Sequence, residues 1–137
     1  MSGTLLDTSA YSAMRRGDDR LREPLSRARE VIVTPVVLGE LLGGFKKGAR
    51  ERENRQALQE FLRSPRVRTV ALDAETSERY AAIWDYLRRQ GTPIPLNDLW
   101  IAASAAQHGL TVLTTDEHFK RIPHILVEWL EPAGATD

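Results

Sequence analysis

Near its amino terminus the chain reads Thr4-Leu5-Leu6-Asp7-Thr8-Ser9-Ala10, a short apolar run that ends in an acidic side chain. If the apolar residues form a buried strand, Asp7 lies at the carboxyl end of that strand. Ligand sites in open α/β sheets gather at this edge, outside the carboxyl ends of the strands. One carboxylate alone indicates little, so the importance of Asp7 depends on whether other acidic residues reach the same edge.

Length and composition predict a single globular domain that spans residues 1–137. The chain contains 42% hydrophobic and 28% charged residues, which are ordinary values for a soluble domain and exclude a collagenous or disordered chain. The last few residues, around Ala133-Gly134-Ala135, are expected to be flexible. The formal net charge is zero, so nucleic acid would have to bind to a local basic patch rather than to a global positive field.

Cysteine is absent from the chain, which excludes disulfides, zinc sites made of thiolates and cysteine nucleophiles. The apolar runs are too short to span a bilayer. The amino terminus lacks the basic segment and long apolar core of a secretory leader. These features predict a cytoplasmic protein with no membrane partner.

Apolar runs with the character of strands alternate with segments of helical spacing. The β-branched run at 30–34 is typical of a strand buried on both sides, and Thr34-Pro35 is a good helix start. The expected strands cover 4–6, 30–34, 67–72, 110–114 and about 125–129. The expected helices begin at or near Ser9, Asp18 or Asp19, Pro35, Ala49, Asp73 and Asn97. This alternation predicts an α/β/α sandwich around a mainly parallel sheet of four or five strands.

Three further acidic residues lie where such a sheet would bring them towards Asp7. Asp116 follows the fourth expected strand as Asp7 follows the first, so both would leave a parallel sheet at the same edge. Asp98 opens a helix after a rigid loop, and Glu40 lies about one and a half turns into the helix that begins at Pro35. Each residue alone has a simpler explanation, because the aspartates can be helix caps and Glu40 a half-exposed helical glutamate.

Clustered carboxylates repel one another unless a proton or a cation lies between them. Mg²⁺ and Mn²⁺ prefer oxygen ligands and would satisfy such a cluster. An ion of this kind activates a water, neutralises phosphodiester oxygens and stabilises the leaving oxygen. The acidic residues therefore predict a divalent-cation site that is suited to phosphate chemistry.

Four segments of the chain surround these acidic residues with small and apolar side chains. They are Leu5-Leu6-Asp7-Thr8-Ser9, Thr34-Pro35-Val36-Val37-Leu38-Gly39-Glu40-Leu41, Leu96-Asn97-Asp98-Leu99-Trp100-Ile101-Ala102-Ala103 and Leu113-Thr114-Thr115-Asp116-Glu117-His118-Phe119. In this order they resemble the successive motifs of a PIN domain, and more narrowly those of the VapC toxins of bacterial toxin-antitoxin pairs. The resemblance covers nearly the whole chain.

The resemblance implies a PIN-like fold and a metal-dependent endoribonuclease, which a cognate antitoxin protein inhibits and which forms a homodimer. It implies a catalytic quartet made of Asp7, Glu40, Asp98 and Asp116. The three aspartates would bind Mg²⁺ or Mn²⁺, and Glu40 would contribute directly or through a water. The expected supporting residues are Ser9 and Thr115, whose hydroxyls would orient a carboxylate or a water, and Glu117, which would substitute for Asp116 or support it.

Basic residues are dense for a chain of zero net charge. Some of them are expected to form a rim beside the acidic pocket that engages the phosphates of an RNA substrate. These residues are Arg15, Arg16, Lys46, Lys47, Arg50 and Arg52. The alternative is a solvated helix stabilised by pairs such as Glu51 and Arg55.

Other functions have less support in the sequence. The histidines His108, His118 and His124 show no paired metal-ligand spacing, although His118 lies two residues from Asp116. A non-catalytic PIN-like module that binds RNA or a partner protein is an alternative, against which the complete quartet argues. A nuclease that acts on structured DNA is a further alternative, but the chain lacks insertions that would clamp a duplex.

Overall fold

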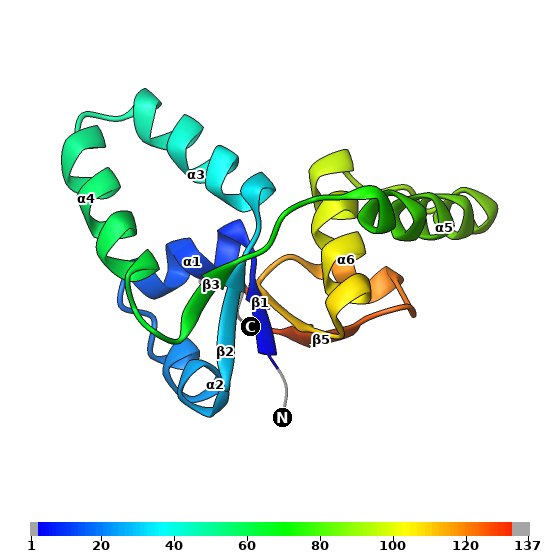
Figure 1. The fold of residues 1–137 in the computed structure, drawn as a ribbon, viewed down its shortest axis with the longest axis horizontal. Coiled ribbons are helices and arrows are strands. Elements are labelled where there is room, and N and C mark those ends of the chain that lie inside the picture. Colours follow the sequence, from blue (N-terminus) through cyan, green and yellow to red (C-terminus); the bar gives the residue numbers. More distant parts are fainter. Residues whose placement is uncertain (1–2, 133–137) are drawn as a thin grey trace.

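Five parallel strands form the centre of the computed structural model, which describes residues 3–132 (Figure 1). The strands are β1 (Gly3–Leu6), β2 (Glu30–Val33), β3 (Val67–Thr69), β4 (Thr111–Thr114) and β5 (Leu126–Trp129). Their spatial order is β3-β2-β1-β4-β5. The predicted sandwich with a mainly parallel sheet is confirmed, whereas the flexibility expected around residues 133–135 lies outside the described residues.

Helices cover both faces of the sheet, which explains why its three middle strands contain runs of consecutive apolar residues. The helices are α1 (Thr8–Arg15), η1 (Asp19–Leu21), α2 (Arg22–Arg27), α3 (Pro35–Lys47), α4 (Glu51–Leu62), α5 (Ala74–Gln90), α6 (Leu96–His108) and η2 (Glu117–Arg121), where η marks a 3₁₀ helix. Figure 1 shows α1 to α4 on one side of the sheet and α5 and α6 on the other. Leu5, Ile32 and Val112 in the middle strands have no exposed surface. Within residues 3–132, no helix is long and apolar enough to cross a membrane.

The direction of strand addition reverses between β1 and β4. From β1 the chain adds β2 and β3 on one side, and it then returns to add β4 and β5 on the other. Leu5 pairs with Val112 and Leu6 with Leu113, so Asp7 and Thr114 come next on neighbouring strands. The crevice outside the carboxyl ends of the strands at such a reversal is the common place for a ligand site in open α/β sheets.

Two predicted boundaries are corrected by the structure. The third strand ends at Thr69 rather than at Leu72, because its neighbour β2 ends at Val33 and offers no further residue to pair with. The helix expected to open at Asn97 begins at Leu96, and Asn97 lies within its first turn. The other four strands agree with their predicted limits within one residue at each end.

Candidate functional site

Asp7 lies at the centre of the candidate site, where β1 ends. The residue is buried, with 4% of its surface exposed. Its Oδ1 accepts hydrogen bonds from the Ser9 hydroxyl at 2.8 Å and from the Ala10 N–H at 2.9 Å. The second bond caps α1, which begins at Thr8, so Asp7 rather than Ser9 is the cap of this helix. Ser9 instead contacts the carboxylate, as expected of a supporting residue.

Thr114, the last residue of β4, contacts two of the acidic residues through one hydroxyl. Its Oγ1 donates to Asp7 Oδ2 at 2.7 Å and accepts the N–H of Asp116 at 2.8 Å, and the residue has no exposed surface. The hydroxyl that contacts Asp7 from this segment is therefore that of Thr114, whereas the expected supporting hydroxyl was that of Thr115. Adjacent side chains of a strand point to opposite faces, and the pairing of β1 with β4 places Thr114 beside Asp7. Thr115 contributes its backbone N–H, which donates to Ser9 Oγ at 3.0 Å.

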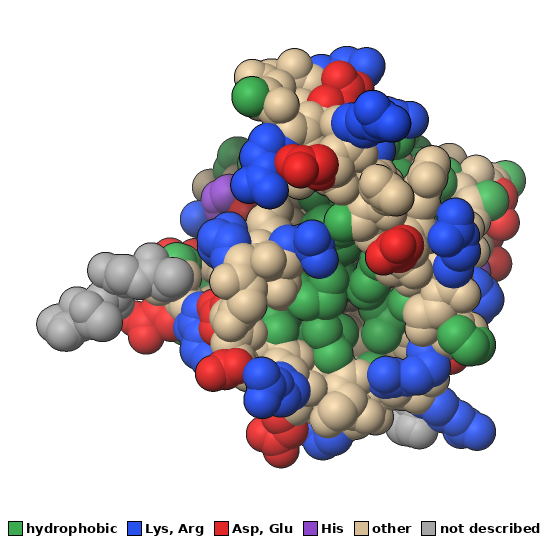
Figure 2. All heavy atoms as spheres, turned by 90° about the vertical axis from the view of Figure 1, so that its left-hand side faces the viewer, with side chains coloured by type: hydrophobic (Ala, Val, Ile, Leu, Met, Phe, Trp, Pro, Cys, Tyr) green, Lys and Arg blue, Asp and Glu red, His purple; other side chains and the backbone are tan. Residues whose placement is uncertain are grey.

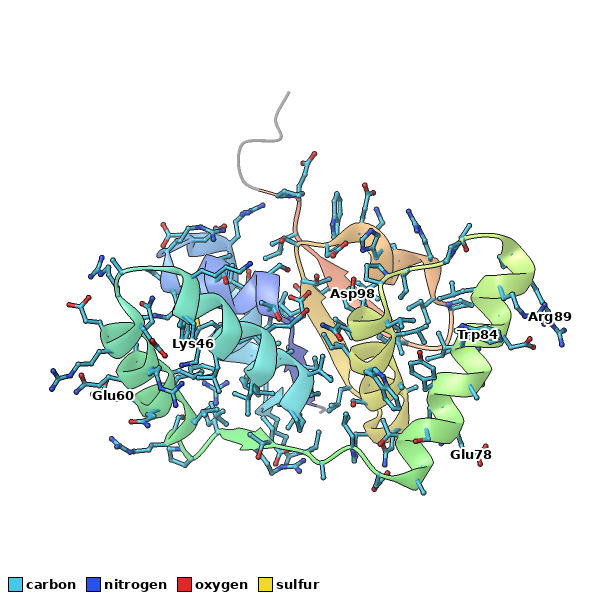
Figure 3. All side chains as sticks on the ribbon, turned by 90° about the horizontal axis from the view of Figure 1, so that it is seen from above. Lys46, Glu60, Glu78, Trp84, Arg89 and Asp98 are labelled. Carbon is cyan, nitrogen blue, oxygen red and sulfur yellow. The ribbon has the colours of Figure 1, made fainter. Side chains whose placement is uncertain are left out.

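Asp98, Asp116 and His118 form a cluster at the same edge of the sheet. Asp98 lies in the first turn of α6, and Asp116 and His118 lie at the start of η2. Figure 3 shows Asp98 near the middle of the molecule, between α3 on one side and α5 on the other. His118 Nδ1 is 3.1 Å from Asp98 Oδ2 and 2.9 Å from Asp116 Oδ1. One ligand atom of each residue lies within 4.8 Å of the others, which is close enough to share a cation.

Glu40 joins the site from α3 and is held by neutral donors. Its half-buried carboxylate accepts hydrogen bonds from the Thr8 hydroxyl and, at 3.1 Å, from Asn97 Nδ2. A partly buried carboxylate needs polar partners, and a hydroxyl and an amide supply them without an ion pair. These bonds also connect α3 to the first turns of α1 and α6, the helices that carry the residues next to Asp7 and Asp98.

Burial and mutual repulsion disfavour the charged carboxylates of the site. Burial raises the pKa of Asp7, against the hydrogen bonds that stabilise its charged form. Burial also raises the pKa of Asp98 to about 6; a hydrogen bond from His118 opposes this shift, and the charges of Asp116 and Asp7 add to it. A cation between these groups would relieve both effects, because it favours the charged form of each carboxylate.

The raised pKa of Asp98 predicts how the stability of the cation-free protein depends on pH. The folded value is about 6 and the ordinary value 3.8, so the folded state binds this proton more tightly than the unfolded chain. The stabilisation that this proton provides is complete below pH 3.8 and is lost as the pH rises through about 6. In EDTA we therefore expect the thermal midpoint of Asp98→Asn to change less across this window than that of the wild type, and to lie at least about 2 °C higher at pH 7. Parallel curves for the two proteins would contradict the assignment.

The donor set fits a hard divalent cation. The carboxylates of Asp98 and Asp116 and the imidazole of His118 lie close enough together to share one ion. The buried carboxylate of Asp7 lies near enough for its charge to raise the pKa of Asp98. Within residues 3–132, no lysine or arginine forms an ion pair with Asp7, Glu40, Asp98 or Asp116. Their negative charge is thus not balanced by a basic side chain, and Mg²⁺ or Mn²⁺ would balance it.

Glu117 does not join the cluster, contrary to the expectation that it substitutes for Asp116 or supports it. Its side chain is exposed, and the next residue of η2, His118, turns towards Asp98 instead. The spacing of two residues from Asp116 was the available signal for His118, and it corresponds to a bond from the His118 N–H to Asp116 Oδ1 at 3.0 Å. Asn97 carried no signal beyond its place next to Asp98.

Some residues of the predicted basic rim form ion pairs, and others line hollows in the surface. Lys46 pairs with Glu51 at 2.9 Å and Arg50 with Glu53 at 2.7 Å, as in the alternative of a solvated, ion-paired surface. Lys47 is exposed. A hollow of about 170 Å³ between α1, α3 and α4 is lined in part by Arg15 and Arg16. A second hollow of about 380 Å³ on α4 is lined in part by Arg52, Arg55 and Arg63. Neither hollow includes a residue of the acidic quartet.

Comparison with known proteins gives similar chains that match over nearly the full length. A family model for the PIN domain matches residues 4–125. Ribonuclease VapC4 of Mycobacterium tuberculosis is 32% identical over 126 residues, which make up 90% of this chain and 93% of that protein. A chain of VapBC2 from Rickettsia felis, bound to a DNA fragment from their promoter, has a TM-score of 0.82 at 26% identity and covers 93% of this chain and 98% of its own. A chain of DNA-bound VapBC from Salmonella typhimurium has a TM-score of 0.82 at 27% identity with the same coverage.

Proposed function

The chain belongs to the PIN-domain family and, within it, to the VapC ribonucleases, and we propose that it is the endoribonuclease toxin of a toxin-antitoxin pair that uses Mg²⁺ or Mn²⁺. The observation that carries this proposal is the cluster of Asp98, Asp116 and His118 beside the buried Asp7, where the strand order reverses. Glu40 faces the same edge from α3, held by its bond from Asn97. The protein would act in the cytoplasm, where its RNA substrate lies.

The residues of the site have different roles in phosphodiester hydrolysis. Asp7, Asp98 and Asp116 would hold the cation, and Glu40 would contact it directly or through a water. When bound, the cation supplies an activated water and neutralises the charge on the phosphodiester oxygens. Glu40 forms no ion pair with a basic residue among residues 3–132, so its carboxylate is suited to accept a proton from the attacking water. Thr114 fixes the orientation of Asp7 and of the backbone at Asp116.

An RNA substrate brings further negative charge to an acidic site, so cationic side chains must hold its other phosphates. Arg15 is the last residue of α1 and Arg16 follows it, and within residues 3–132 neither forms an ion pair of the kind that holds Lys46 and Arg50. We therefore assign phosphate contacts first to these two arginines. Lys47 and Arg52 would extend the contact along α3 and α4.

The face made by α1 to α4 is suited to a protein partner. Figure 2 shows hydrophobic side chains gathered in a hollow on this face, with lysine and arginine side chains around it. Helices α1 to α4 carry the partly buried Met14, Leu25, Leu42, Phe45 and Phe61. An apolar patch with a polar rim marks a protein-binding surface. The similar chains come from VapBC assemblies, and VapBC is a family of toxin-antitoxin systems, which supports a cognate antitoxin as this partner.

Cation-dependent cleavage of RNA by the purified chain is the experiment that tests the function. We expect defined RNA fragments in Mg²⁺ or Mn²⁺, no cleavage in EDTA, and recovery when the cation is restored. Mapping the RNA ends in cells that express the chain alone would identify the target. Binding of RNA without cleavage would favour the non-catalytic module, and cleavage of structured DNA alone would favour the other alternative.

An apolar groove on the opposite side of the molecule supports the homodimer. The groove has a volume of about 290 Å³ and lies between α5, α6 and the loop that joins them. It is lined by Trp84, Leu87, Arg88, Pro93, Ile94, Leu96 and Leu99. Trp84 is 46% exposed and Leu96 is 60% exposed, so two large apolar side chains face water at its rim. We assign a second copy of the chain to this surface.

Trp84→Glu is expected to convert the dimer into a monomer, because it places a charge in the apolar contact. Sedimentation equilibrium should give twice 15.4 kDa for the wild type and 15.4 kDa for the variant. Leu126→Glu is the matched control, because Leu126 is 70% exposed on β5, away from the groove, and this variant should stay dimeric. A dimeric Trp84→Glu protein would exclude this groove as the interface.

A further inference from the structure

We propose that His118 is a ligand of the cation in the acidic cluster and that its nitrogen makes the site prefer Mn²⁺ to Mg²⁺. This inference rests on the proposed function, because it concerns the ion that the carboxylates hold. The set predicted from the sequence contained oxygen ligands only and left the two ions as equal alternatives. The structure adds one imidazole nitrogen, which changes the chemistry of the set.

The position of the His118 ring is fixed by its surroundings. Its Nδ1 lies 3.1 Å from Asp98 Oδ2 and 2.9 Å from Asp116 Oδ1, and its backbone N–H donates to Asp116 Oδ1 at 3.0 Å. The next residue, Phe119, has no exposed surface and anchors η2 in the core. The imidazole is 34% exposed, so it lies at the mouth of the site with Nδ1 directed inwards.

These distances match those between neighbouring ligands of one ion. Two adjacent ligands in an octahedron of radius about 2.1 Å lie about 3.0 Å apart. Hydrogen bonding explains the arrangement only in part, because Nδ1 carries at most one hydrogen and cannot donate a full bond to both Asp98 and Asp116. A cation at the point where the three ligand atoms converge would satisfy all of them at once.

A nitrogen ligand discriminates between the two ions. Mg²⁺ is a hard ion that binds oxygen and gives up its waters reluctantly. Mn²⁺ accepts the same carboxylates, and as a first-row transition ion it also binds imidazole. An oxygen set that contains one imidazole therefore favours Mn²⁺, whereas an all-carboxylate set would leave the two ions closer in affinity.

Pulsed electron paramagnetic resonance of bound Mn²⁺ tests the proposed ligand without measuring activity. The wild type should show coupling of Mn²⁺ to a ¹⁴N nucleus, and protein labelled with ¹⁵N-histidine should show the ¹⁵N pattern instead. The chain has three histidines, so His118→Gln should lose the coupling and His124→Gln should keep it. His124 is a suitable control because it is exposed and packs against Tyr86, with ring centroids 5.4 Å apart. The labelled wild type needs no substitution, so the test does not depend on the folding of a variant.

Calorimetry of Mn²⁺ and Mg²⁺ binding tests the preference. Loss of a residue that merely supports a ligand costs about 10- to 100-fold in metal affinity, so removing the nitrogen ligand should weaken Mn²⁺ binding at least about tenfold and Mg²⁺ binding less. His118→Asp keeps a ligand at this position but makes it an oxygen, so both ions should still bind. The dissociation constant for Mg²⁺ divided by that for Mn²⁺ should fall, because the preference for Mn²⁺ is lost.

The outcomes separate this proposal from the proposed function. Bound Mn²⁺ without nitrogen coupling, coupling that survives in His118→Gln, or an unchanged ratio in His118→Asp would each overturn the role of His118, while cation-dependent RNA cleavage would still stand. Failure of the wild type to bind either ion would overturn both proposals.

Discussion

Asp7→Asn is expected to reduce RNA cleavage by at least about 100-fold, because substitution of residues that only support metal ligands already costs about 10- to 100-fold. The amide keeps the shape of the side chain and can still accept the bonds that the Ser9 hydroxyl and the Ala10 N–H donate to Oδ1. It removes the negative charge next to the cation, and its NH₂ group replaces the oxygen Oδ2 that accepts the Thr114 hydroxyl. The measurement is the single-turnover rate of RNA cleavage at saturating Mn²⁺, together with the binding constant for Mn²⁺.

The fold should survive this substitution, which makes the loss of activity interpretable. Burial raises the pKa of Asp7, so its charge is disfavoured in the cation-free protein and the thermal midpoint in EDTA should not fall. Asp19→Asn is the matched control, since the Asp19 side chain is 82% exposed and pairs with Arg22 at the surface. It should cleave RNA at the wild-type rate. An Asp7→Asn protein that cleaves within a few-fold of the wild type would refute the central role of this carboxylate.

The parts of the site that were predictable are those that depend on the strands alone. Leu5 and Leu6 form a continuous apolar run because the sheet is covered on both faces, and such a run is visible without a structure. Once the strands are parallel, the residues that follow them reach one edge. This is sufficient to bring Asp7 and Asp116 together. The predicted starts of the helix after β2 and of α6 place Glu40 and Asp98 near the same edge.

The parts that were not predictable depend on side chains far apart in the sequence. The bond from Thr114 to Asp7 joins residues 107 positions apart, and the bond from Asn97 to Glu40 spans 57 positions. No periodicity in the sequence relates such pairs, because strand register and helix packing determine them. The rotation of the 3₁₀ helix η2 decides that His118 rather than the preceding glutamate faces the site.

Substitutions at Thr114 and Thr115 distinguish the roles of the two neighbouring hydroxyls. Thr114 is the only residue of the pair whose hydroxyl contacts Asp7 within residues 3–132, and it also accepts the N–H of Asp116. Valine has nearly the same shape as threonine but has no hydroxyl. Thr114→Val therefore leaves the buried Asp7 Oδ2 without its donor and the Asp116 N–H without its acceptor, while the packing of β4 is preserved.

Thr114→Val is expected to weaken Mn²⁺ binding and RNA cleavage by about 10- to 100-fold, the usual cost of losing a partner that orients a metal ligand. The unfolding free energy should fall by about 1–3 kcal/mol, because a buried polar group loses its hydrogen bond. Thr115→Val should change neither quantity, and Thr114→Ser, which retains the hydroxyl, should recover most of the activity. A role in packing alone would lower the stability of Thr114→Val but leave its Mn²⁺ affinity at the wild-type value. Equal losses in Thr114→Val and Thr115→Val would contradict the assignment of the orienting hydroxyl to Thr114.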